Sequence, residues 1–335
     1  MENDFKGRII YSENYQSTID SIKIINKSDS NNASVIKHNR EFIDSSINSD
    51  ICIIKGYEKN TKIKRENLVA PDLLSAYDES ILELNSLEGK VRCIAHSSVI
   101  QINNEYVPAG YVSLKFFTKS NLISAKATDL SDIIKSNDIA KSITDEYIKE
   151  RKYFLSKAAP NDSLMFIDGP MFSGAATNGN FILINELLSK NCRPIFFVKN
   201  SESTIITERF GFAKEYNSDL HWAYSNLEVG EVSPVFAYTI EGRSKAMCFM
   251  KVFDKRSPVR IEFPLKEFEE NWYNDDVFDQ IFYQFLANGS ANNMQPRIIQ
   301  ISEMYAREIL KSTNLYKEIN KMGLTKNMNE ERGMF

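Results

Sequence analysis

Cysteine is scarce in this chain, and its spacing excludes the sites that cysteines most often build. The 335 residues include four cysteines, Cys52, Cys93, Cys192 and Cys248, and no two of them are separated by only two residues. A Cys-x-x-Cys zinc knuckle or redox motif is therefore excluded. Because three of the four lie within apolar runs typical of strands, we expect buried, reduced thiols.

Long apolar runs are also lacking. No stretch approaches the roughly 20 apolar residues that span a bilayer. The first six residues, Met1–Lys6, do not have the apolar core of a signal peptide. We therefore expect a cytoplasmic protein that does not use a membrane.

Positive charge is not in excess either. The chain has 41 Lys and Arg against 45 Asp and Glu, which gives a formal net charge of -4. This balance excludes a globally basic nucleic-acid binder but not a local basic channel, because steering depends on the local field. The sequence also lacks a Gly-x-x-x-x-Gly-Lys-Ser/Thr phosphate loop, a Gly-x-Gly-x-x-Gly fingerprint and a nucleophile elbow.

What the chain does contain is an apolar run that ends in a carboxylate and a turn. Leu164–Ile167 is followed by Asp168, Gly169 and Pro170. Buried strands are short apolar runs closed by turn residues, and α/β folds place ligands and metals at the carboxyl ends of their strands. Asp168 is therefore a candidate ligand, although an Asp in this position can also simply cap the turn.

Hydrophobic periodicity predicts a mixed sequence of strands and helices. Predicted strands cover residues 50–56, 90–102, 106–118, 121–127, 164–168, 192–199, 235–240, 245–253 and 259–263, with a hairpin turn at Asn103-Asn104. Predicted helices cover residues 72–87, 140–157, 181–190, 276–286 and 297–312. A hairpin followed by alternating helices and strands indicates an α/β protein with a mixed β-sheet.

Further polar residues lie at the ends or on single faces of these elements. Lys199 ends an apolar run, where its ammonium could meet a phosphate, orient a carboxylate or simply reach solvent. Arg260 and Glu262 share one strand face, which on its own is explained by a solvated ion pair. Glu303 and Arg307 form an i,i+4 pair on the last helix, which is likewise a sufficient structural explanation.

Four short motifs together resemble the NurA family of DNA-end-processing nucleases. Phe166–Pro170 resembles its internal strand ending in Asp-Gly-Ser/Pro, and Phe197–Ser201 resembles its strand ending in Lys-Ser/Thr. Val259–Pro264 resembles its Arg-Ile-Glu-x-Pro strand, and Gln295–Arg307 resembles its final helix. The order and spacing of these motifs agree over about residues 85–312.

The resemblance implies an RNase H-like fold, which is a mixed sheet flanked by helices, and a manganese-dependent nuclease site. It also implies a homodimer with a DNA channel, and a hexameric HerA-type ATPase as partner. The corresponding domains are an extension at 1–85 for dimerisation or partner binding, a nuclease domain at 86–315 and a flexible tail at 316–335. The family's metal carboxylates map onto Asp168 and onto Glu150 of the preceding helix, with Glu146 as the second choice.

Two departures from the family pattern concern the metal site. The family's first motif, a strand ending in Asp-Gly-Ser, is aligned with Ile94–Ser97, so that Ala95 takes the place of its Asp. His96 would then partly replace the missing ligand. Glu303 takes the place of the family's His, and Gln295 the place of its Tyr. A carboxylate at residue 303 suits Mn²⁺ or Mg²⁺, but loss of a central Asp can abolish a two-metal site.

Two functions follow from the resemblance. The first is a metal-dependent DNA nuclease that works with a HerA-type ATPase in DNA end processing or anti-phage defence, and the second is a degenerate subunit that binds DNA or regulates the ATPase without cutting. The expected residues are Asp168, Glu150, Lys199 and Glu303 for catalysis, Asp168, Glu150, Glu303 and His96 for Mn²⁺ or Mg²⁺, and Arg260, Lys251 and Arg256 for DNA.

Overall fold

The computed structural model describes most of the chain from residue 50 onward. The described residues are 14, 16–23, 50–63, 68, 71, 73–102, 105–125, 132–172, 174–273, 276–288, 294–314, 317–318, 321 and 324–325. The chain divides into two units, Met1–Ile43 and Asp44–Phe335. In the first unit, residues 16–23 are helical. The predicted hairpin turn at Asn103-Asn104 lies outside the described residues, as does most of the predicted tail.

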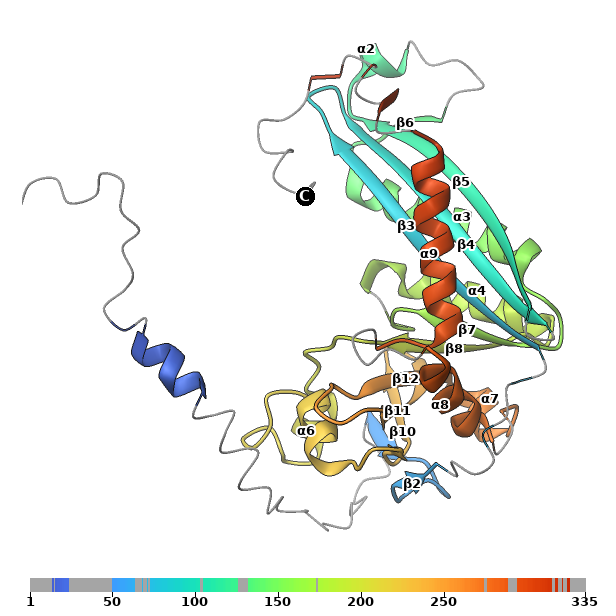
Figure 1. The fold of residues 1–335 in the computed structure, drawn as a ribbon. Helices are drawn as coiled ribbons and strands as arrows, with labels where there is room; N and C mark the ends of the chain where they lie inside the picture. The colour runs from blue at the N-terminus through green and yellow to red at the C-terminus, as the bar shows by residue number, and fades with distance from the viewer. Residues whose placement is uncertain are drawn as a thin grey trace, which may run out of the picture. The chain divides into compact units, whose positions relative to one another are not determined.

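A mixed, 12-stranded sheet is the centre of the second unit in the described part of the chain (Figure 1). Its main path runs β1-β10-β11-β12-β8-β7-β3-β4-β5-β6, and β9 joins β2 to β11. The strands are β1 (Ile51–Ile53), β2 (Thr61–Lys62), β3 (Leu73–Asn85), β4 (Lys90–Ile102), β5 (Glu105–Thr118), β6 (Ile133–Lys135), β7 (Leu164–Asp168), β8 (Arg193–Val198), β9 (Glu231–Val232), β10 (Phe236–Ile240), β11 (Arg243–Lys251) and β12 (Val259–Pro264).

Helices cover both faces of this sheet, and each face has its own apolar core. The helices are α2 (Asn121–Ser124), α3 (Ile139–Ala158), α4 (Thr177–Ser189), α5 (Ile205–Arg209), α6 (Asp219–Asn226), α7 (Leu265–Glu269), α8 (Val277–Ala287) and α9 (Arg297–Ser312). One core joins the sheet to α3 and α4, and the other joins it to α7, α8 and α9. The predicted mixed α/β sheet is thus confirmed. No described helix is both long enough and apolar enough to cross a bilayer.

Two predicted elements are wrong. Most of the predicted helix 72–87 is strand β3 (Leu73–Asn85), which lies between β7 and β4 and is buried on both faces over residues 74–78. A strand buried on both faces does not alternate between apolar and polar residues, so its spacing can imitate a helix. In the predicted strand 121–127, the described residues 121–125 do not form a strand, since Ser120 caps the short helix α2 and β6 pairs with β5 instead.

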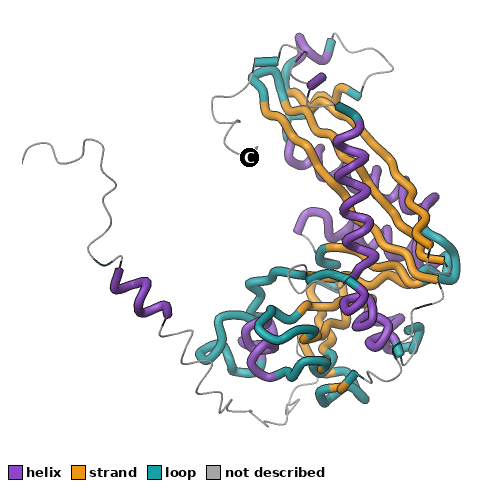
Figure 2. Tube along the Cα trace, in the orientation of Figure 1, coloured by secondary structure: helices purple, strands orange, loops and turns teal. Residues whose placement is uncertain are grey.

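The topology brings three strand segments to one place. β7 runs parallel to both β3 and β8, so the carboxyl ends of β7 and β8 open onto the middle of β3. Beyond that point β3 continues alongside β4 and β5 as a long three-stranded ribbon with α9 across it (Figure 2). The strands before residue 85 therefore belong to the same sheet as those after it. A separate role of residues 1–85 in dimerisation or partner binding stays a prediction.

Candidate active site

Asp78 and Asp168 are the two carboxylates at the centre of the site. The parallel register pairs Tyr77 of β3 with Ile167 of β7, and each acid is the residue that follows. Because strand side chains alternate, both acids point away from the core that contains Tyr77 and Ile167, toward the face covered by α9. Gly169, with φ +98°, then turns the chain away from the strand end.

Burial and mutual repulsion make this a site with excess negative potential. Burial raises the pKa of Asp78 to about 8, with further upward contributions from Asp168 and Glu79. Burial also raises the pKa of Asp168, although Lys199 acts in the opposite direction. A pair of partly desolvated carboxylates is the arrangement that a cation stabilises.

Lys199 supplies a positive charge at the edge of this pair. Its ammonium lies 2.8 Å from Asp168 Oδ2 and donates to Gln295 Oε1 at 2.7 Å. The amide of Gln295 donates in turn to Glu303 Oε2 at 2.7 Å, and the other oxygen of Glu303 pairs with Arg307. This chain of contacts connects the end of β8 with the first turns of α9. The structure thus brings together Asp168, Lys199 and Glu303, as the sequence predicted.

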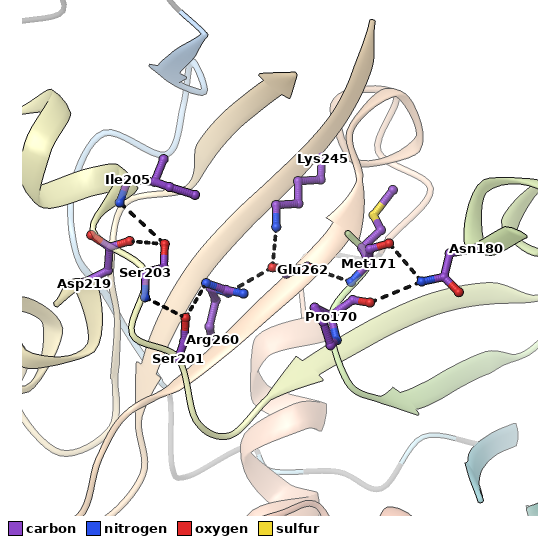
Figure 3. A network of polar contacts seen from close by, with 10 residues as sticks. All are labelled: Pro170, Met171, Asn180, Ser201, Ser203, Ile205, Asp219, Lys245, Arg260 and Glu262. Atoms are coloured by element: carbon purple, nitrogen blue, oxygen red, sulfur yellow. Dashed lines mark hydrogen bonds and ion pairs between the residues drawn. The ribbon is translucent and has the colours of Figure 1, made fainter. Parts of the chain in front are cut away.

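A buried carboxylate holds the loop that follows Asp168 (Figure 3). Glu262 is fully buried, and its Oε2 accepts the backbone N–H of Met171 at 2.7 Å. Its Oε1 contacts the ammonium of Lys245 at 2.5 Å and Nε of Arg260 at 2.9 Å. Burial alone would raise the pKa of Glu262, but Lys245 and Arg260 bring it below its ordinary value. Arg260 and Glu262 do form an ion pair, but the expectation that solvent surrounds it is wrong, because Met171 and Lys245 contact Glu262 and both members of the pair are buried.

The same loop is fixed from the side of α4. The amide of Asn180 donates to the carbonyl oxygens of Pro170 and Met171 at 3.3 and 3.0 Å. Asn180 is oriented by Arg151, whose guanidinium donates to its Oδ1 at 2.8 Å. The loop after Asp168 is therefore held by β12 on one side and by α4 on the other.

Glu150 and His96 lie on the other face of the sheet from Asp168. Glu150 Oε1 lies 3.4 Å from Lys115, and its Oε2 lies 3.7 Å from Nε2 of His96. His96 is buried among aromatic rings, and its Nδ1 is 2.7 Å from the hydroxyl of Tyr77. The predicted convergence of Glu150 with Asp168 is not found, because the neighbour of Asp168 is Asp78. Glu146, the second choice, pairs with Lys115 and Lys149.

The three basic residues expected to bind DNA have different surroundings. Arg260 is buried, and besides Glu262 it contacts Ser201 at 2.8 Å. Lys251 is also buried, and its ammonium donates to the carbonyl oxygen of Tyr224 at 2.8 Å. Arg256 is exposed and lines an open cavity of about 520 Å³ together with Lys255. Of the three expected residues, only Arg256 is thus presented to the surface.

The donors at the site suit a hard divalent cation. Asp78 and Asp168 offer carboxylate oxygens, which Mg²⁺ and Mn²⁺ prefer. Among the residues that the structure describes, no three His, Cys, Asp or Glu side chains are grouped closely enough to hold a metal ion. Mg²⁺ is commonly bound through one or two carboxylates, with water and substrate phosphates completing its shell. The pair therefore fits such an ion.

Comparison with known proteins identifies the family. The model of the NurA domain matches residues 51–306. The chain belongs to the NurA family. The crystal structure of the NurA nuclease from Sulfolobus solfataricus is similar over 92% of this chain and 98% of that one, with 12% identity and a TM-score of 0.50. A crystal structure of NurA with manganese matches over 91% and 98% of the two chains, with 8% identity and a TM-score of 0.47. No curated protein matches the sequence.

Membership of the NurA family makes it possible to place the first acidic motif again. Residues 76–80 read Ala-Tyr-Asp-Glu-Ser, which fits the NurA strand motif Asp-Gly-Ser with Glu79 in place of Gly. The segment Ile94–Ser97, with which the sequence analysis aligned this motif, lies on β4 directly opposite, and its Ser97 pairs with Asp78. The structure thus places a carboxylate, that of Asp78, beside Asp168, where residue 95 offers none.

Sequence reasoning missed Asp78 and Glu79 because it assigned their segment to a helix. A signal was nevertheless present, since an acidic pair follows the apolar and small residues Leu73–Tyr77. Glu79 points to the face opposite Asp78, where it accepts a hydrogen bond from the hydroxyl of Tyr147 at 2.9 Å. Its charge still contributes to the raised pKa of Asp78 and Asp168.

Proposed function

We propose that this protein is a DNA nuclease that depends on a divalent metal ion. The observation that supports the proposal most directly is the placement of Asp78 beside Asp168 on parallel strands, with Lys199 in contact with the second acid. Asp78 and Asp168 are the residues that would hold Mn²⁺ or Mg²⁺. Membership of the NurA family supports a nuclease, since the S. solfataricus protein of similar fold is described as one, and DNA as the substrate is what the NurA resemblance implies.

The chemistry is hydrolysis of a phosphodiester. A bound divalent ion supplies Lewis-acid stabilisation of the phosphate and a water of lowered pKa. The oxygen of water forms a bond to phosphorus, the ester P–O bond breaks, and the released oxygen takes up a proton. Lys199 contributes a point charge that can contact a phosphate oxygen. Glu262, Asn180 and Arg260 keep the loops after β7 and β8 in place, so that Asp168 and Lys199 do not have to be ordered when DNA binds.

We also propose the partners that the NurA resemblance implies. The protein would act as a homodimer with a hexameric HerA-type ATPase that feeds duplex DNA to it, in DNA end processing or in anti-phage defence. A basic path for DNA would include Arg256 and Lys255 at the turn between β11 and β12. Arg260 and Lys251 would act on this path only through the protein groups that they contact.

The test is a cleavage assay on linear duplex and single-stranded DNA in Mn²⁺, Mg²⁺ or EDTA, with and without the ATPase. We expect cleavage that requires the metal and that is lost in Asp78→Asn and in Asp168→Asn. The complex with the ATPase matters because DNA delivery can limit the rate. Absence of cleavage by the complex in both metals would refute the proposal.

One observation favours the non-catalytic alternative. Asp168 is already paired with Lys199, and both oxygens of Glu303 are engaged by Gln295 and Arg307. A site closed in this way would bind DNA or regulate the ATPase without cutting. It predicts salt-sensitive DNA binding and no metal binding that depends on Asp78. Metal binding that is lost in Asp78→Asn decides in favour of the nuclease.

A further inference from the structure

The ammonium of Lys199 occupies a fixed position beside the acidic pair. Asp168 Oδ2 and Gln295 Oε1 accept from the same nitrogen, at 2.8 and 2.7 Å. The side chain is about 30% exposed, so it is neither a free surface lysine nor a core residue. Two acceptors from separate elements, the end of β7 and the segment before α9, determine where this positive charge lies.

A second metal ion would need ligands on the side where Lys199 lies. In two-metal sites the ions are roughly 3.5–4 Å apart and share bridging carboxylates. Asp168 Oδ2 is in contact with the ammonium, and Glu303 directs its oxygens to Gln295 and Arg307. The carboxylates therefore provide for one cation while a protein cation is already present at their edge.

We propose that the site takes a single divalent ion and that the ammonium of Lys199 stands in place of the second. This inference rests on the proposed function, because it concerns how the same site balances the charge of a bound phosphodiester. The ion would lie with Asp78 and Asp168, and Lys199 would contribute the second positive charge to the phosphate. The residue at 295 then has a specific role.

Gln295 is a positioning residue in this arrangement. It is 1% exposed, and its carbonyl accepts from Lys199 while its amide donates to Glu303. A tyrosine, which the NurA pattern has here, would have to accept and donate through one hydroxyl oxygen, whereas Gln295 uses two separate atoms for the two contacts. Glu303, at the position of the NurA His, orients the amide of Gln295 and is itself held by Arg307. Gln295 and Glu303, the two residues that depart from the family pattern, thus act together to hold the ammonium of Lys199 in place.

The test counts metal ions per chain in the full-length protein. Mn²⁺ is titrated, and free Mn²⁺ is followed by electron paramagnetic resonance, with calorimetry as a second readout. We expect a single ion per chain in the wild-type protein and a second ion in Lys199→Gln, whose amide oxygen can join a metal shell. Lys199→Arg retains the charge and should keep the count at a single ion. Lys199→Met removes the ammonium in a different way and serves if the Gln variant does not fold.

Lys115→Gln is the matched control. Lys115 is also partly buried and paired with a carboxylate, Glu146 at 2.9 Å, but on the face covered by α3. Its count should remain that of the wild type. Two ions per wild-type chain overturn the inference, as does an unchanged count in both Lys199→Gln and Lys199→Met. Failure of the proposed function looks different: Asp78→Asn would then bind Mn²⁺ as well as the wild type does.

Discussion

Asp78 and Asp168 occupy successive positions of the same parallel register, one in the middle of β3 and the other at the end of β7. The two strands are far apart in sequence, and β7 is followed by a turn whereas β3 continues. Their side chains consequently meet at the point where the sheet changes from many strands to a three-stranded ribbon. Among the described residues of β3, Asp78 is the only buried carboxylate, and Asp168 is its acidic neighbour on the same face.

The first prediction compares Asp78 with Glu150. Asp78→Asn should lower the rate of DNA cleavage by more than about a hundredfold, because residues that only support metal ligands already cost 10–100-fold. Glu150→Gln should leave Mn²⁺ affinity within about threefold of the wild type, because Glu150 lies on the other face of the sheet and is not a ligand. Loss of a true ligand would cost far more than that. Mn²⁺ titration and a cleavage assay measure both. If the two variants lose Mn²⁺ affinity and cleavage rate to the same extent, Asp78 is not the metal ligand.

The contrast between these two acids shows where sequence reasoning reached its limit. Asp168 could be predicted because a short apolar run, a Gly and a Pro surround it, and each has a local physical meaning. Asp78 could not, because β3 is buried on both faces and its apolar spacing imitates a helix. The face on which an acid lies depends on pairing with distant strands, which periodicity alone does not determine.

For Glu262 too, the sequence predicted the local pairing but not the burial of the charge. Alternation correctly placed Arg260 and Glu262 on one strand face, and they do form an ion pair. The sequence could not show that β12 lies between β8 and β11, nor that Met171 and Lys245 contact Glu262 on this face. Lys199 and Glu303 are brought together as expected, but through Gln295, whose role depends on α9 crossing the sheet.

The second prediction concerns pH and the metal-free protein. The pKa of Asp78 is about 8 in the folded protein and 3.8 in the absence of its surroundings. The folded state keeps a proton that the unfolded state releases, so this group's contribution to stability is full below pH 4 and is lost as pH rises through 8. The charges of Asp168 and Lys199 on the same face, and of Glu79 on the opposite face, are included in that value.

The measurement is the melting temperature in EDTA between pH 5 and 8.5. The wild type should lose more than Asp78→Asn over this range, with a difference on the order of 5 °C at pH 8. Mn²⁺ should raise the wild-type value at pH 8, since metal binding requires the deprotonated carboxylate. Parallel curves for the two proteins would show that Asp78 does not titrate in this range.

The third prediction tests the buried carboxylate of Glu262. Glu262→Gln keeps the shape of the side chain but leaves Lys245 and Arg260 without their shared counter-ion. Removal of one partner from a buried ion pair typically costs 3–5 kcal/mol, so we expect a loss of about 3 kcal/mol in the free energy of unfolding. Urea denaturation followed by circular dichroism measures it.

Glu241→Gln is the control for this experiment. Glu241 pairs with Arg243 at the turn between β10 and β11, where its side chain is 78% exposed. Solvent screens such a pair, so the change should be less than about 0.5 kcal/mol. Should the two variants be equally stable, Glu262 does not compensate the two buried cations.

The fourth prediction concerns the packing of α4 against α3. Gly179 lies in α4, and a Cβ atom added there would be 2.5 Å from both Cγ1 and Cγ2 of Ile148 in α3. These atoms are attached directly to Cβ of Ile148, so the side chain cannot move its end aside. Gly179→Ala should therefore destabilise the protein by about 1–2 kcal/mol, although alanine favours a helix by up to about 1 kcal/mol.

In an Ile148→Ala background the clash is removed, and the same substitution should become neutral or stabilising. A double-mutant cycle in urea gives the coupling energy. If Gly179→Ala has the same effect in both backgrounds, the contact between Gly179 and Ile148 does not set the distance between the two helices, and the loop contacts that Asn180 makes from α4 must be positioned in another way.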